Sequence, residues 1–303
     1  MAIEAATEQV LLESESLFLE PTLIRKKILF RNYKQGEDKM KMPRITNTIE
    51  EISCDYNKAK ENPNVFYAQS FLNRNGCLLN SDNNKVTISN QIAEWMLSSN
   101  PLSSIKKIDM PKDMTYLIEW HSGNPTTETK NSNREEELVA MSLFKKKVYP
   151  HSDIDCFIDY QVPIYRGHEH ENEHIGKIDL VAISHKNHKV LLMELKKHSS
   201  DETLLRCVSE IYTYYKQIDS EKLKKEISER PNNNAILEYE VVPAVLVFKN
   251  QRQHTQYTCK NYDKVKELMK DLGVSMYVID STMKFDSKQY AAYIEQCCIT
   301  NID

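Results

Sequence analysis

Apolar and polar positions follow strand-like and helix-like patterns in turn through the second half of the chain. Runs rich in β-branched and long apolar residues, bounded by polar or turn-forming residues, indicate strands, whereas apolar residues recurring every three or four positions indicate helices. The expected strands are 154–165, 177–184, 189–196, 241–248 and 275–280. The expected helices are 134–147, 202–218, 262–272 and about 287–298. This order indicates an α/β fold with a mixed sheet flanked by helices.

Two local signals sharpen this picture. The run 241–248 is nearly all apolar, as expected of a strand buried on both faces. Gly273 follows an apolar helical pattern and is typical of a helix C-cap.

The polar, breaker-rich run 121–133 separates this half from a front half that has both helical and strand patterns, including a helix around Trp95. We therefore expect an α+β domain at 1–125 and an α/β domain at 126–303.

Charged residues interrupt the apolar pattern of the strands 177–184 and 189–196. The four residues between these strands, His185-Lys-Asn-His188, are polar and turn-like, which predicts a hairpin. If Lys186 and Asn187 form the centre of the turn, symmetric pairing sets Asp179 opposite Glu194. The two carboxylates would then be cross-strand neighbours, with Cβ atoms about 5 Å apart.

These positions predict a site for a divalent cation. Side chains alternate along a strand, so Glu194 and Lys196 share one face while Met193 and Leu195 point to the other. Two adjacent carboxylates repel unless a cation lies between them, and hard oxygen ligands suit Mg²⁺. A lysine beside such a metal can orient or activate a water, which fits hydrolysis of a phosphodiester.

A simpler interpretation is two solvated strand ends. Glu-x-Lys triplets are common in a chain that is 28% charged, and others occur at Glu37-x-Lys39 and Glu128-x-Lys130. The triplet Glu194-Leu-Lys196 differs from these because it ends an apolar strand and follows, at the length of a hairpin, an aspartate that itself interrupts an apolar strand.

The combination of Asp179 on one strand with Glu194-Leu-Lys196 on the next resembles the PD-(D/E)xK nuclease superfamily, which has the restriction-endonuclease-like fold. The resemblance covers roughly residues 130–280 and looks similar to an uncharacterised bacterial branch of that superfamily. It implies that Asp179, Glu194 and the backbone carbonyl of Leu195 bind Mg²⁺ or Mn²⁺, and that Lys196 orients the attacking water. The implied substrate is DNA, cleaved to leave a 5′-phosphate.

The superfamily usually places a further glutamate on the helix before these strands. In the run Asn133-Arg-Glu-Glu-Glu137 we choose Glu136, because Val139 and Leu143 follow it by three and seven residues and set it at the edge of a buried stripe. Glu135 is the alternative. Acids are also favoured at a helix N-terminus by the helix dipole without any catalytic role. Ser132 or Asn133 is the expected N-cap.

The superfamily often follows Glu-x-Lys with a helix that carries Gln-x-x-x-Tyr. Here the corresponding residues are Glu210 and Tyr214, so the glutamine is replaced. Arg206, one turn earlier, is either a phosphate contact or an ion-pair partner of Glu210. Gly176 would permit a close approach of backbone to substrate. The expected substrate-binding residues are therefore Gly176, Lys177, Arg206, Glu210 and Tyr214.

The net charge, the cysteines and the N-terminal residues limit which partners and which cellular location we expect. The net charge of −4 is unfavourable for a nucleic-acid binder. The basic runs 25–27, 145–147 and 222–225 are each interpreted as a solvated face more readily than as a DNA groove. Seven cysteines without a Cys-x-x-Cys pair, and no signal-peptide or membrane-spanning pattern, predict a cytoplasmic protein without a membrane partner.

Several alternatives stay open. By analogy with multidomain nucleases, residues 1–125 serve recognition, sensing or dimerisation. The run His168-Glu-His170-Glu-Asn-Glu-His174 is either a solvated loop over the site or a transition-metal site. The rival functions are a catalytically silent nucleic-acid-binding or regulatory module of the same fold, and a phosphodiesterase acting on RNA or nucleotides. A homodimer and a role in restriction or phage defence are compatible with the sequence.

Overall fold

The computed structural model describes residues 63–79, 84–110, 114–117, 135–146, 149–165, 174–230, 234–283 and 290–303. Several predictions lie outside these residues. They are the N-cap at Ser132 or Asn133, the histidine-rich run up to residue 173, and the basic run 25–27.

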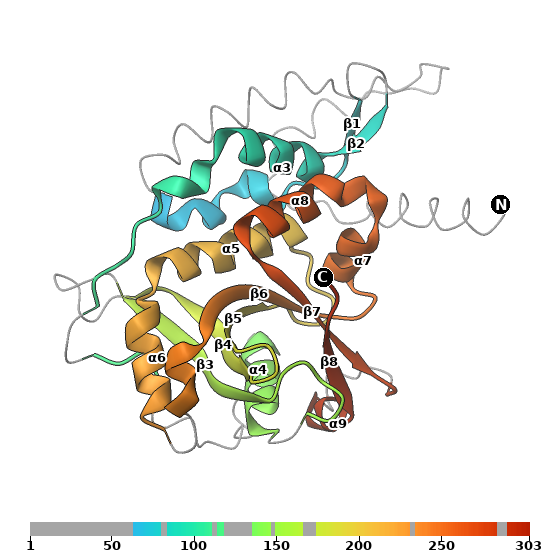
Figure 1. The fold of residues 1–303 in the computed structure, drawn as a ribbon. Helices are drawn as coiled ribbons and strands as arrows, with labels where there is room; N and C mark the ends of the chain where they lie inside the picture. Colours follow the sequence, from blue (N-terminus) through green and yellow to red (C-terminus); the bar gives the residue numbers. More distant parts are fainter. Residues whose placement is uncertain are drawn as a thin grey trace, which may run out of the picture.

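A six-stranded mixed sheet forms the centre of the molecule (Figure 1). Its strands lie in the order of the sequence: β3 (Cys156–Tyr165), β4 (His174–Ser184), β5 (Lys189–Leu195), β6 (Glu240–Phe248), β7 (Ser275–Ser281) and β8 (Cys297–Asn301). Strands β5, β6 and β7 are parallel, and the remaining pairs are antiparallel. The mixed sheet and the α/β class are confirmed, and β6 is buried along nearly its whole length as predicted.

Helices cover both faces of the sheet. Three of them match predicted helices: α4 (Glu135–Lys145), α5 (Leu204–Gln217) and α8 (Asp263–Leu272). Helix α8 ends at Gly273, whose φ of 66° is left-handed, so the predicted C-cap is confirmed. Helices that the pattern did not predict are α6 (Ser220–Ser228) and α7 (Arg252–Thr258), and the short 3₁₀ helices of this half are η8 (Asn234–Glu238) and η9 (Lys260–Tyr262).

The described front residues form a smaller set of elements. They are η3 (Pro63–Ala68), η4 (Ser70–Asn73), the hairpin of β1 (Cys77–Leu79) and β2 (Lys85–Thr87), α3 (Ile88–Ser99) and η5 (Pro101–Ser104). Helix α3 is the helix predicted around Trp95. Its N-cap is Thr87, whose side chain accepts a hydrogen bond from the backbone N–H of Asn90 at 3.2 Å.

The two faces of the sheet carry separate hydrophobic clusters. Helices α3, α5 and α8 lie together on one side of the sheet, and α4 and α9 (Tyr290–Glu295) lie on the other (Figure 1). Val190 and Leu192 of β5 belong to the first cluster, and Leu191 and Met193 to the second, as the alternation of a strand requires.

Apolar residues of the front half join the cluster on the α5 side. Phe71, Leu72, Ile92 and Met96 are buried together with residues of α5, α8 and the sheet. The described parts of the predicted domains 1–125 and 126–303 therefore share one core. The boundary near residue 125 stays a prediction.

The prediction of a final helix at 287–298 is partly wrong. Helix α9 ends at Glu295, and Cys297–Asn301 forms β8, which pairs antiparallel with β7. Tyr293, Ile294 and Cys297 are buried on the α4 side. Edge pairing with β7 prevailed over continuation of the helix beyond Glu295.

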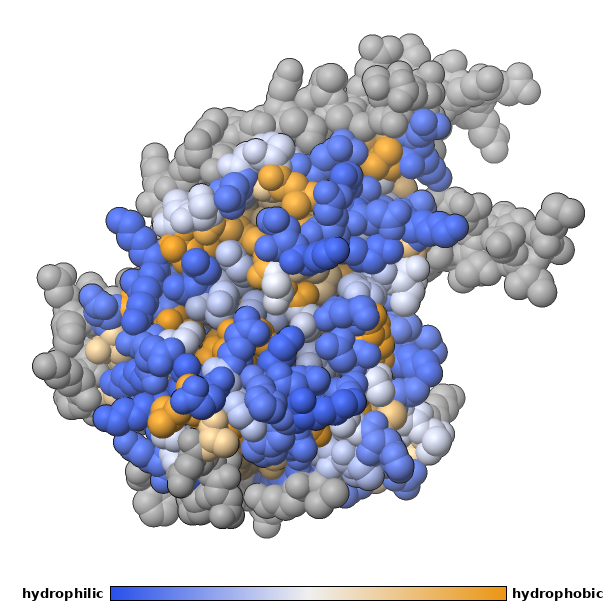
Figure 2. Space-filling model, in the orientation of Figure 1, coloured by the Kyte–Doolittle hydropathy of each residue, from blue (hydrophilic) through white to orange (hydrophobic). Residues whose placement is uncertain are grey.

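The surface is consistent with this arrangement. The face shown in Figure 2 is mostly hydrophilic, with hydrophobic residues in small separate groups. Leu237 is the large hydrophobic residue of the described part that is well exposed, at 48%. Within the same part, no helix combines the length and the apolar character that crossing a membrane requires.

Candidate active site

The hairpin of β4 and β5 has the predicted register. Leu180 pairs with Met193 and Ser184 with Lys189, and the turn at 185–188 is closed by a hydrogen bond from the His188 N–H to the His185 carbonyl at 3.2 Å. Continued by one residue, this register sets Asp179 opposite Glu194. The Asp179 carboxylate accepts a hydrogen bond from the backbone N–H of Leu195 at 2.9 Å. The two acids therefore lie side by side where the paired strands end.

The two faces of β5 divide as predicted. Met193 and Leu195 are buried in the cluster on the α4 side. Glu194 and Lys196 face α5, because Lys196 forms ion pairs with Glu202, just before that helix, and with Glu210 within it. The face that carries Val190 and Leu192 is therefore core along most of β5 and holds charged side chains only at its end, at Glu194 and Lys196.

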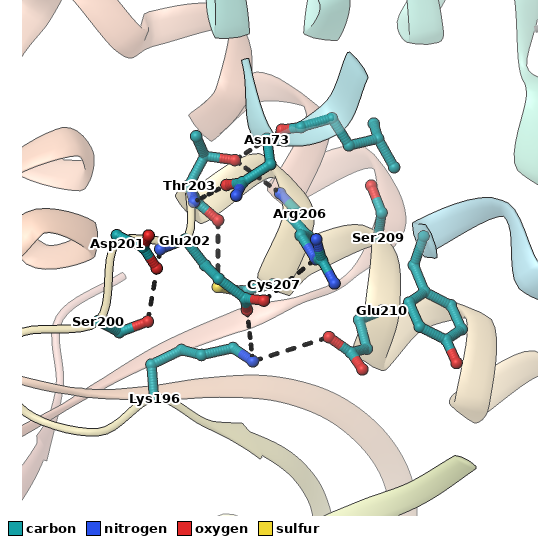
Figure 3. Close-up of polar contacts among 12 residues, drawn as sticks. Asn73, Lys196, Ser200, Asp201, Glu202, Thr203, Arg206, Cys207, Ser209 and Glu210 are labelled. Carbon is teal, nitrogen blue, oxygen red and sulfur yellow. Dashed lines mark hydrogen bonds and ion pairs between the residues drawn. The ribbon is translucent and has the colours of Figure 1, made fainter. Parts of the chain in front are cut away.

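Lys196 is the centre of a buried ionic network (Figure 3). Its Nζ lies 2.6 Å from Glu194 Oε1, 2.6 Å from Glu202 Oε2 and 3.7 Å from Glu210 Oε2. Only 5% of Lys196 and 3% of Glu194 is exposed. Burial alone would lower the pKa of the ammonium, but the charges of Glu194 and its neighbours outweigh burial and raise the pKa of Lys196 well above its usual value. Lys196 is therefore held as a cation.

Both carboxylates of the hairpin resist ionisation. Burial is the largest cause that raises the pKa of Asp179, to about 7, and the charge of Glu136 adds to it, whereas Lys196 lowers it in part. Burial and then the charge of Glu210 raise the pKa of Glu194 well above its usual value. More negative charge is concentrated here than Lys196 neutralises, and a cation placed between Asp179 and Glu194 would relieve the excess.

Gln161 is a residue of this site that sequence reasoning missed. Tyr160 pairs with Leu180 and Val162 with Ile178, so Gln161 lies opposite Asp179 on the neighbouring strand. Its backbone has a φ of 53°, and its side-chain amide donates to Asp179 Oδ1 at 2.8 Å. The left-handed backbone of a non-glycine residue gave no signal in the sequence.

Helix α4 brings Glu136 to the end of β5. Glu136 Oε1 accepts a hydrogen bond from the backbone N–H of Lys197 at 3.2 Å. Glu135, the alternative, pairs with Lys197 Nζ at 3.0 Å, and both of these side chains are about 40% exposed. Val139 and Leu143 are fully buried, as the predicted stripe requires. Of the two acids, Glu136 is the one whose charge raises the pKa of Asp179.

Helix α5 supplies the acids that surround Lys196. Thr203 caps the helix, accepting from the Arg206 N–H at 3.2 Å. Glu202, just before the cap, pairs with Arg206 Nε at 3.2 Å as well as with Lys196. Arg206 is thus an ion-pair partner of Glu202, and Glu210 faces Lys196 instead. The sequence analysis assigned no role to Glu202. The i,i+4 spacing between Glu202 and Arg206 could have indicated their ion pair.

The predicted substrate-binding residues have different surroundings in the structure. Lys177 is exposed on β4. Gly176 leaves room for a side chain of the protein itself, because a Cβ atom at this position would lie 2.6 Å from Tyr214 Cζ and 2.7 Å from its Cε1. The space that the sequence assigned to an approaching substrate is occupied by the Tyr214 ring.

Gly176→Ala is therefore expected to destabilise the protein by about 1–3 kcal/mol, because an added methyl group overpacks a buried contact. Tyr214 is only 3% exposed and cannot move outward freely. Urea denaturation measures the change, with Gly273→Asn as a control at a glycine where a Cβ atom meets nothing within 4 Å and where asparagine tolerates the left-handed backbone. A stability equal to wild type would contradict the close contact between Gly176 and Tyr214.

Comparison with known proteins adds no assignment. No family model, no curated protein and no solved structure matches this chain. Among the described residues, no group of three or more histidine, cysteine, aspartate or glutamate side chains is arranged to hold a metal ion. Any function must therefore be argued from Asp179, Glu194, Lys196 and their neighbours.

Proposed function

We propose that the protein is a Mg²⁺- or Mn²⁺-dependent nuclease that hydrolyses phosphodiester bonds of DNA. The observation that carries the proposal is a pair of carboxylates, the half-buried Asp179 and the buried Glu194, beside the buried Lys196 at the end of a hairpin. The order of helix α4, the β4–β5 hairpin and helix α5 agrees with the restriction-endonuclease-like fold. The proposal includes that fold and a role in restriction or phage defence.

The oxygen atoms at the site fit a hard divalent cation. Asp179 accepts one hydrogen bond at each carboxylate oxygen, from Leu195 N–H and from Gln161, which leaves a second lone pair on each. Glu194 and the Leu195 carbonyl complete the proposed ligands, with Glu136 acting through a second metal or a bound water. Such a cation, when bound, polarises a phosphoryl oxygen and lowers the pKa of a bound water.

The chain's own residues position the reactants. Lys196 has three N–H donors, and the nearby acids keep it protonated. A donor in this state can hold a water, or an oxygen of the phosphate, through a charge-assisted hydrogen bond. Glu202 and Glu210 fix the direction of the lysine side chain, which reduces the entropy lost when a substrate is oriented.

Cleavage of supercoiled and linear DNA, with single-stranded RNA in parallel, tests the proposal in the presence of Mg²⁺ or Mn²⁺. Glu194→Ala and Lys196→Ala are each expected to reduce the cleavage rate by at least about 100-fold, as removal of a general acid–base or charge-stabilising group does. Glu221→Ala, which removes a glutamate side chain that is 80% exposed, is the control and should cut like wild type.

Each other outcome points to a rival function. Cleavage of RNA alone would identify a ribonuclease. Tight DNA binding without cleavage under any metal would favour the silent binding module. Equal cleavage by wild type and both site variants would place the active site elsewhere in the chain.

A further inference from the structure

A tyrosine of the front half reaches the candidate active site. Tyr67, on η3, has its hydroxyl 3.0 Å from the hydroxyl of Tyr214, and the two rings meet edge to face with centroids 5.3 Å apart. The Tyr214 hydroxyl also lies 3.2 Å from Glu210 Oε1. Because the other oxygen of Glu210 faces Lys196 Nζ at 3.7 Å, a continuous polar chain links Tyr67 to the lysine.

The chemistry of these groups sets the direction of the hydrogen bonds. The carboxylate of Glu210 can only accept, and Tyr214 has a single proton to donate. When Tyr214 donates that proton to Glu210, Tyr67 must donate to Tyr214. Burial, the largest cause, raises the pKa of both phenols, so both keep their protons at neutral pH. Hydrogen bonds in such a chain polarise and strengthen one another.

A second contact fixes the front segment against α5. The backbone N–H of Thr203 donates to Asn73 Oδ1 at 2.7 Å, and the Thr203 hydroxyl donates to the Leu72 carbonyl at 2.6 Å. Asn73 and Thr203 are seen together beside the Lys196 network in Figure 3. The segment is thus attached at the start of α5, while Tyr67 contacts Tyr214 further along the same helix. Two attachments on one helix hold the Tyr67 ring in place.

We propose that Tyr67 is a positioning residue, which acts through Tyr214 and Glu210 to hold Lys196 in its working position. The front segment 63–73 is then part of the active site instead of a separate recognition element. This inference rests on the proposed nuclease function for its kinetic consequence. Its structural consequence, an effect of Tyr67 on Lys196, does not depend on that function.

Tyr67→Phe in the full chain tests the proposal, with Tyr212→Phe as the matched control. Tyr212 lies on α5, two residues before Tyr214, and is half-buried beside Tyr215, with ring centroids 6.0 Å apart. Loss of the Tyr67 hydroxyl weakens one hydrogen bond of the chain, so kcat for DNA cleavage should fall about three- to tenfold with little change in KM. The pH profile of kcat should also shift. Tyr212→Phe should change neither.

A measurement that needs no activity separates this inference from the proposed function. In protein labelled with ¹⁵N-lysine, the Lys196 Nζ signal is assigned by its loss in Lys196→Met. We expect Tyr67→Phe to move that signal and Tyr212→Phe to leave it in place. An unmoved signal would overturn the positioning role even if DNA is cut. A moved signal would support the positioning role even if no nucleic acid is cut.

Discussion

Lys196→Met is expected to lower the free energy of unfolding by about 3–5 kcal/mol near neutral pH, the usual cost of removing one partner of a buried ionic network. The methionine fills much of the lysine's volume, so the loss reports charge more than packing. Without the ammonium group, the acids that now surround it would lie close together without a cation. Urea denaturation at several pH values measures the effect, which should shrink in acid as these carboxylates take up protons.

Lys197→Met is the matched control for this prediction. Lys197 pairs with Glu135 at 3.0 Å, but its side chain is 40% exposed. Exposed ion pairs contribute about 0–1 kcal/mol, so this substitution should have a small effect. If the two lysine variants lost equal stability, the buried network around Lys196 would not exist in solution.

Asp179→Asn is expected to have opposite effects on stability and on activity. The pKa of Asp179 is raised from 3.8 to about 7. Because the folded protein then binds the proton more tightly than the unfolded chain, stability falls as pH rises through this interval, and the penalty is complete above pH 7. The amide carries no charge, so without metal at pH 8 the variant should be more stable by about 1–3 kcal/mol.

The hydrogen bonds of Asp179 can survive this substitution. The amide oxygen can accept from the Leu195 N–H, and a turned Gln161 amide can accept from the new NH₂ group. Denaturation in EDTA at pH 8 and at pH 4 measures the gain, which should vanish at the lower pH. DNA cleavage should fall by at least about 100-fold, because a charged oxygen ligand is lost. A variant destabilised at pH 8 would contradict the raised pKa.

Short-range patterns predicted the hairpin and the positions along the chain of β3 to β7, but not β8. The polar turn at 185–188 fixed the register of β4 on β5, and period-two alternation fixed which face carries Glu194. Gly273 ended α8 because a left-handed residue is required there. These features depend on residues close together in the sequence, so the sequence displays them directly.

Other parts of the site depend on tertiary contacts and could not be predicted. Gln161 lies opposite Asp179 only because of the register of β3, and Tyr67 meets Tyr214 across 147 positions of sequence. Lys146, interpreted as part of a solvated basic run, is buried and donates to the carbonyls of Ile294, Glu295 and Cys297. No local pattern distinguishes such a lysine from a surface one.

The shared core has a consequence for the order in which the chain folds during synthesis. Residues of the described front half form hydrogen bonds with residues that come much later in the sequence. The Leu72 carbonyl accepts from the Thr203 hydroxyl, the Thr87 hydroxyl donates to the Asn261 carbonyl, and the Tyr116 N–H donates to Glu226. Contacts of such long sequence separation form slowly. We therefore expect the described apolar residues of the front half to stay exposed to solvent until α5 and α8 have been synthesised, which makes the unfinished chain prone to aggregation during that interval.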